Sequence, residues 1–198
     1  MMRMGKLMLA AGLAAMPTAP ALAGWKLVSH GAEVKVAKSA LGVTPSEDWN
    51  RWSTRPIAKG EVWTLDGAGL NELYFVSGLA AGETLFKDAR KKDAPLPKLP
   101  ANAQLTDIPD FFESSERVGL NTSAFELIGS EPAKLGGRSA IRFTYRYAVE
   151  GSALQRKGVA TATLENGQLT LIAFAAPETF IFNRDAPKAL AVMNSARF

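Results

Sequence analysis

Three consecutive segments in the last third of the chain constrain its fold more than any other feature. Residues 138–149 alternate strictly between apolar and polar side chains. Residues 154–164 and 169–175 follow, and the dipeptide Asn166-Gly167, which favours a two-residue hairpin turn, joins them. Because the side chains of a strand point alternately to its two faces, this pattern predicts an antiparallel meander of three long strands.

The first face of this meander combines large and small side chains. If Glu165 pairs with Gln168 and Val149 pairs with Leu154, the aromatic residues of the first strand stand beside small residues of the next two. The face then carries Ile141, Phe143, Tyr145, Tyr147, Gly158, Ala160, Ala162, Leu164, Leu169, Leu171, Ala173 and Ala175. A C-terminal helix that begins at Asp185, with Pro187 in its first turn and alanines along one side, is predicted to pack there.

Shorter strands are expected in the first half of the chain. Residues 25–29 and 33–37 are predicted to form a hairpin across His30-Gly31, and residues 61–66 and 72–76 to form another across a glycine-rich turn.

Between these hairpins, Ser46 is expected to cap a single helical turn in which Trp49 and Trp52, three residues apart, share one face. Indoles in such a position either stack on a ligand or close the open end of a core.

A helix is predicted from Asp107, its cap, to Gly119, which ends it. Three acidic residues spaced by three lie along it, namely Asp110, Glu113 and Glu116. Such a stripe either binds a metal or forms a solvated face near the positive end of the helix dipole. Since no histidine accompanies these acids, we expect the solvated face.

The first 23 residues have the pattern of a secretory signal peptide. Arg3 and Lys6 precede an apolar run that is too short to cross a bilayer, and Ala21-Leu22-Ala23 matches a cleavage site. Cleavage after Ala23 is expected, with an uncleaved anchor as the alternative. Residues 24–198 would then form one α+β domain without a transmembrane segment, in the periplasm or secreted. The Pro- and Lys-rich residues 87–100 are expected to connect the two halves of that domain.

Composition removes several classes of function. The chain has no cysteine, which excludes disulfide scaffolds, cysteine-ligated metal sites and thiol nucleophiles. It has one histidine, His30, in a predicted turn, and no cofactor or metal is expected. Removal of the signal peptide takes away two of the 23 basic residues and none of the 19 acidic ones, so that the formal net charge falls from +4 to +2. Nucleic acid is therefore not an expected partner of this exported chain.

The second face of the meander carries a basic strip. Arg142 and Arg146 lie there, and Arg146 stands opposite Lys157 in the predicted register. Like charges in that position are unfavourable unless an acid or a bound anion lies between them. These cations, with Trp49 and Trp52 as a lid, either hold a small anionic or amphiphilic ligand or extend to acidic residues elsewhere in the fold.

Motifs for nucleophilic serine, zinc-protease, phosphate-loop and dinucleotide chemistry are absent from the sequence. We therefore expect a protein that is not an enzyme. A hydrolase that uses scattered acidic residues is kept as a third hypothesis. Such an enzyme would require two facing carboxylates from separate elements of the fold.

The closing segments carry a resemblance. The meander, the hairpin in Leu164-Glu-Asn-Gly-Gln-Leu-Thr-Leu-Ile172, the apolar Phe174-Ala-Ala-Pro177, and the final helix ending at Phe198 resemble the PsbP/Mog1-like α/β/α sandwich over residues 123–198. The chain is also similar to uncharacterised bacterial envelope proteins. The resemblance implies a non-catalytic protein that docks onto a larger complex or acts as a small binding module, and it transfers no site residue.

Taken with the residues, this resemblance predicts an α+β fold in which helices pack on an antiparallel meander. The expected function is that of a non-enzymatic binding or accessory protein of the cell envelope, whose partner is an envelope protein or a membrane-associated complex. A carrier of a small anionic or amphiphilic ligand is the alternative.

Overall fold

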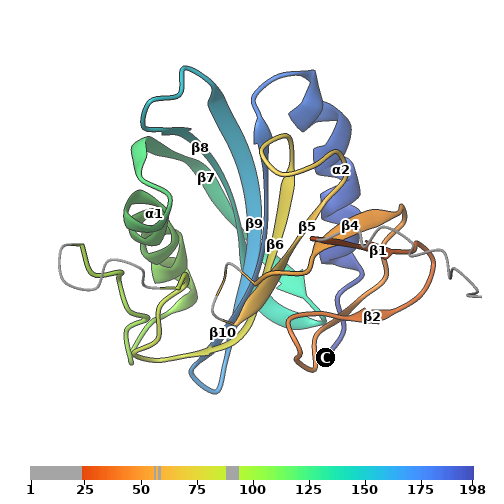
Figure 1. Ribbon diagram of the computed structural model, residues 1–198. Helices are drawn as coiled ribbons and strands as arrows, with labels where there is room; N and C mark the ends of the chain where they lie inside the picture. Colours follow the sequence, from red (N-terminus) through yellow and green to blue (C-terminus); the bar gives the residue numbers. More distant parts are fainter. Residues whose placement is uncertain (1–23, 56, 58, 88–93) are drawn as a thin grey trace, which may run out of the picture.

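An eight-stranded antiparallel sheet with one helix on each face forms the centre of the molecule (Figure 1). The computed structural model describes residues 24–198 except 56, 58 and 88–93. The predicted signal peptide lies outside the described residues, and so do residues 88–93 of the predicted 87–100 connection. The strands follow one another across the sheet in the order β1-β4-β5-β6-β10-β9-β8-β7.

The sheet strands are β1 (Trp25–Val28), β4 (Trp49–Trp52), β5 (Gly60–Thr64), β6 (Glu72–Ala80), β7 (Thr122–Leu135), β8 (Arg138–Val149), β9 (Gln155–Glu165) and β10 (Gln168–Pro177). A separate two-stranded ribbon pairs β2 (Val34–Lys35) with β3 (Gly42–Val43). The helical elements are the 3-10 turn η1 (Leu105–Asp107) and the helices α1 (Ile108–Gly119) and α2 (Phe180–Asn194).

The predicted meander is confirmed in its strands and in its register. Glu165 pairs with Gln168, and Arg146 lies opposite Lys157. Asn166 and Gly167 both adopt positive φ, at 51° and 72°, which a two-residue hairpin turn of the primed type requires.

The predicted position of the C-terminal helix is wrong, because α2 covers the opposite face of the meander. The face with Phe143, Ala160 and Ala173 packs against α1, whereas α2 packs on Ile172 and Phe174 (Figure 1). Complementary side-chain sizes explain why α1, and not α2, packs on the face with the small residues. The Phe112 ring of α1 lies 4.9 Å from the ring of Tyr145 and fills the space above the small residues, while the alanines of α2 fit against the bulkier face.

The start of α2 also differs from the prediction. Thr179 caps the helix and accepts a hydrogen bond from the backbone of Ile181 at 3.3 Å, so that the helix begins five residues before Asp185. Asp185 is instead buried inside the helix, where Asn71 donates a hydrogen bond to its carboxylate at 2.9 Å. Pro187 lies in the helix interior.

The N-terminal half departs from the predicted pairing. The strand β1 pairs with β4 rather than with β2, and residues 49–52 form a strand rather than a helical turn. Since residues three apart in a strand point to opposite faces, Trp49 and Trp52 do not share one. The pairing of β5 with β6 across a turn is as predicted.

An edge strand, β7, was not predicted. It contains Pro132, and its pairing with β8 shifts between Leu127 and Gly129. Proline and a register irregularity are typical of sheet edges, and both obscure the alternation that marks a strand in sequence.

The helix predicted from Asp107 to Gly119 is confirmed as α1, but its acidic stripe is not a solvated face throughout. Asp110 is exposed, whereas Glu116 is 4% exposed and faces the sheet. Over the described ranges, neither α1 nor α2 combines the length and the apolar character that crossing a bilayer would need.

Candidate functional site

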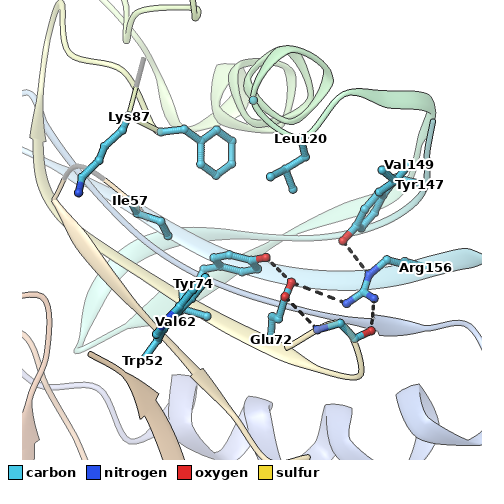
Figure 2. A pocket seen from close by; sticks show the side chains of 13 residues that line it. Trp52, Ile57, Val62, Glu72, Tyr74, Lys87, Leu120, Tyr147, Val149 and Arg156 are labelled. Carbon is cyan, nitrogen blue, oxygen red and sulfur yellow. Dashed lines mark hydrogen bonds and ion pairs between the residues drawn. The ribbon is translucent and has the colours of Figure 1, made fainter. Parts of the chain in front are cut away.

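A cavity of about 480 Å³ lies between the end of α1 and the sheet (Figure 2). Its walls are mainly apolar, and four polar side chains gather at one end. The lining residues are Trp52, Ile57, Val62, Gly69, Glu72, Tyr74, Phe86, Lys87, Gly119, Leu120, Tyr147, Val149 and Arg156. We call this space the amphiphilic cavity.

Three strands deliver the polar side chains to one face of the sheet. Glu72 and Tyr74 are two residues apart on β6 and therefore point the same way. Tyr147 on β8 and Arg156 on β9 are directly paired in register, which places their side chains next to each other. Figure 2 shows these four groups converging beneath Leu120.

The carboxylate of Glu72 is held from three sides. The hydroxyl of Tyr74 donates a hydrogen bond to Oε2, and the backbone N–H of Gly69 donates to Oε1 at 3.2 Å. A guanidinium nitrogen of Arg156 lies 3.8 Å from Oε2. These contacts fix the position of the carboxylate, whose side chain is 19% exposed, and they offset the cost of its partial burial.

The guanidinium of Arg156 is similarly fixed. Its Nε donates to the hydroxyl of Tyr147 at 3.0 Å, and its two Nη atoms donate to the carbonyls of Gly69 at 2.6 Å and Ala175 at 3.4 Å. Burial alone would lower the pKa of Arg156, but the neighbouring Tyr147 and Glu72 outweigh it and leave that pKa raised. The arginine is therefore charged and immobilised at the polar end of the cavity.

A second carboxyl group lies close behind this cluster. Burial, together with the charge of Glu72, raises the pKa of Glu116 to about 8, although Arg156 acts in the opposite direction. The Glu116 carboxyl group accepts no hydrogen bond and forms no ion pair within the part of the chain that the structure describes. Burial also raises the pKa of Tyr74 well above its ordinary value, so that its hydroxyl stays protonated and donates to Glu72.

This arrangement can accommodate a molecule with an apolar body and a small polar end. The side chains of Ile57, Val62 and Leu120 offer apolar contact, and Tyr74 and Arg156 offer polar groups at one end. The ammonium group of Lys87 lies at the opposite side (Figure 2). Pockets that bind small molecules combine these two features and commonly have volumes of roughly 300–1,000 Å³.

The comparisons with known proteins concern the fold. Neither the protein-family models nor the curated proteins contain a match. The solution structure of PsbP from the cyanobacterium Synechocystis sp. PCC 6803 matches 93% of this chain and 96% of its own, with a TM-score of 0.53 and 15% sequence identity. The fold is PsbP-like. The crystal structure of LpqN, a Mycobacterium tuberculosis protein involved in cell envelope biogenesis, matches 87% of this chain and 89% of its own, with a TM-score of 0.38 and 12% identity.

Within this PsbP-like fold, the predicted basic strip lies on the α2 face, away from the amphiphilic cavity. Glu178 accepts two hydrogen bonds from Arg146, at 2.5 and 2.7 Å, and Glu126 accepts a third at 3.2 Å. Lys157 lies 5.3 Å from the centre of the Phe182 ring. The guanidinium of Arg146 is therefore already paired with carboxylates of the chain itself.

The remaining predicted site residues lie apart from one another in the fold. Arg142 donates to Thr161 at 3.1 Å and to Asn194 at 3.0 Å. Trp49 is fully buried in the core beneath α2, whereas Trp52 lines the amphiphilic cavity and stacks on Trp25 with 5.8 Å between ring centres. The structure does not bring Arg142, Arg146, Lys157, Trp49 and Trp52 together into one surface.

The polar cluster of the cavity was missed by sequence reasoning, although one signal was present. The predicted register already placed Arg156 opposite Tyr147, on the apolar face of the meander. A charged residue at such a position needs a buried partner. The partner is Glu72, which lies on β6. This strand pairs with β10, about a hundred residues later in the sequence, so that no local pattern predicts the contact.

Proposed function

We propose that this protein is a non-enzymatic binding protein of the cell envelope that takes up a small amphiphilic molecule in the amphiphilic cavity. The observation that carries the proposal is a cavity of about 480 Å³ with apolar walls and a fixed polar cluster at one end. The proposal keeps the carrier alternative predicted from the sequence but places the ligand among different residues, of which only Trp52 was predicted. The PsbP-like fold is compatible with it but does not specify a ligand.

The hydrolase hypothesis receives one supporting observation, because Glu72 and Glu116 are two inward carboxyl groups with different environments. Two features favour binding over catalysis. Only Glu72 lines the cavity, and its carboxylate is already engaged by Tyr74, Gly69 and Arg156. Neither carboxyl group is therefore placed to transfer a proton to a molecule in the cavity.

An envelope location and a docking partner form the other part of the proposal. The signal-peptide pattern of residues 1–23 supports export to the periplasm or beyond. The partner would be an envelope protein or a membrane-associated complex, which crosslinking and pull-down of the mature protein from its native envelope would identify. Failure to detect the chain outside the cytoplasm would contradict this part alone.

Calorimetric titration with decanol and decanoate tests the cavity. We expect one molecule of at least one of these amphiphiles to bind per chain. Leu120→Trp should weaken binding by about tenfold or more, because the indole fills the cavity. Val118→Trp, two residues earlier at an exposed position of α1, is the matched control and should bind as the natural chain does.

Absence of binding to both amphiphiles would overturn the proposal, as would equal affinities of the Leu120→Trp and Val118→Trp variants. Thermal unfolding of each variant shows whether it is folded before the titrations are compared.

A further inference from the structure

A second hollow, of about 510 Å³, lies where β1, β2 and β4 meet, and it is strongly basic. Five cations line it together with one carboxylate: Lys26, Lys35, Lys38, Arg51, Arg55 and Glu61. Trp52 and Ser53 complete the lining. We call this space the basic hollow. Apart from Trp52, it shares no lining residue with the amphiphilic cavity.

The carboxylate at its base does not neutralise the hollow. Glu61 is 3% exposed, and it accepts hydrogen bonds from the indole of Trp63 at 2.7 Å and from the backbone N–H of Ala37 at 3.1 Å. Arg51 lies 3.7 Å from the same carboxylate. Glu61 therefore acts as an internal anchor for Arg51 and for the turn that carries Lys38.

The remaining cations are poorly neutralised. Lys35 is the exception, since it forms an ion pair with Glu33 at 3.0 Å. Lys26, Lys38 and Arg55 form no ion pair with any described residue.

Two local features of the basic hollow are unfavourable in energy, one in its charges and one in its backbone. Lys26 and Arg51 are directly opposite each other in the register of β1 and β4, an arrangement that is unfavourable for like charges. Ala37 and Lys38 both adopt positive φ, at 56° and 51°, although neither is glycine. Backbone of this kind is uncommon and clusters at binding sites.

We infer that the basic hollow binds a phosphate group. A multivalent oxyanion would relieve the repulsion between Lys26 and Arg51 and would accept several charge-assisted hydrogen bonds at once. Arg51, held by Glu61, presents a pre-oriented guanidinium, and the flexible ammonium groups of Lys26 and Lys38 reach the same space. Either a soluble phosphate compound or the head group of an anionic phospholipid supplies this chemistry.

Titration of the mature chain with inorganic pyrophosphate tests the inference. The double variant Lys26→Gln/Lys38→Gln should bind pyrophosphate about tenfold more weakly or not at all. Lys26→Arg/Lys38→Arg should retain binding, because the charges remain. Lys98→Gln/Lys134→Gln removes the same number of exposed charges elsewhere and serves as the control.

Vesicle sedimentation separates the two sources. Binding to phosphatidylcholine vesicles that contain phosphatidylglycerol, lost in Lys26→Gln/Lys38→Gln and displaced by pyrophosphate, identifies a lipid head group. Pyrophosphate binding without vesicle binding identifies a soluble phosphate compound. The inference is overturned if neither probe binds, or if the Lys26→Gln/Lys38→Gln variant binds as the Lys98→Gln/Lys134→Gln control does.

Discussion

At the scale of single residues, Glu116 has the most unusual environment among the described acidic side chains with a resolved pKa shift. Burial and the charge of Glu72 raise its pKa from 4.5 to about 8, so that it is mainly protonated at neutral pH. Between these two values the folded chain holds a proton that the unfolded chain releases. Raising the pH through this window therefore destabilises the fold, and the penalty is complete above about pH 8.

Glu116→Gln is predicted to remove this dependence, because the amide resembles the protonated acid in size and charge. The stability of the natural chain should fall relative to the variant by up to about 1.4 kcal/mol per pH unit between pH 4.5 and pH 8. Urea unfolding across this range measures the difference. Parallel pH profiles for the two proteins would show that Glu116 is ionised in the fold.

At the scale of elements, the pairing of β8 with β9 depends on a glycine beneath an aromatic ring. Gly158 lies directly opposite Tyr145 in the register, and a Cβ atom at this position would come within 2.2 Å of the tyrosine ring. That ring is stacked on Phe125 and packed against Phe112, so that it has little room to move.

Gly158→Ala is therefore predicted to destabilise the fold by about 1–3 kcal/mol through overpacking. Gly129→Ala is the matched control, since the added methyl group on β7 meets no atom within 4 Å and the backbone has no positive φ. The control should change stability by less than about 0.5 kcal/mol. Equal unfolding midpoints for the two variants would contradict this account of the β8–β9 pairing.

The elements also show what the sequence can and cannot predict. Strict alternation and Asn166-Gly167 predict β8, β9 and β10 with their register, because these signals are local. The partner of β1 and the side of the sheet that α2 covers depend on contacts between distant segments, for which no local signal exists. The amphiphilic cavity belongs to the same class, since Glu72 and Arg156 meet only after the sheet has formed.

At the scale of the whole molecule, a buried carboxylate connects α2 to the turn between β5 and β6. Asp185 accepts hydrogen bonds from Asn71 at 2.9 Å and from Arg184 at 2.6 Å, and it lies 3.3 Å from Lys188. Burial alone would raise the pKa of Asp185, but the hydrogen bonds from Arg184 and Lys188 outweigh it and leave that pKa lowered. Its stabilising effect is therefore present above the pKa of the unfolded chain and is lost as the pH falls through the lower folded value.

Asp185→Asn is predicted to reduce the free energy of unfolding at pH 7 by about 1.5–3 kcal/mol, because charge-assisted hydrogen bonds are lost. The difference from the natural chain should shrink below about pH 4. Glu47→Gln, which removes an exposed partner of Lys188, should change stability by less than about 1 kcal/mol. Thermal unfolding at several pH values measures both variants, and a constant difference down to pH 2 would refute the role given to the Asp185 charge.

The edge strand β7 limits how the molecule can associate. Pro132 offers no N–H group to a further strand, and the irregular register near Gly129 bends the edge. The opposite edge, β1, spans only four residues. Both ends of the sheet therefore resist extension by another chain, whether a second copy or an incoming peptide. A partner of the kind proposed above would therefore bind through side-chain surfaces rather than through shared backbone hydrogen bonds.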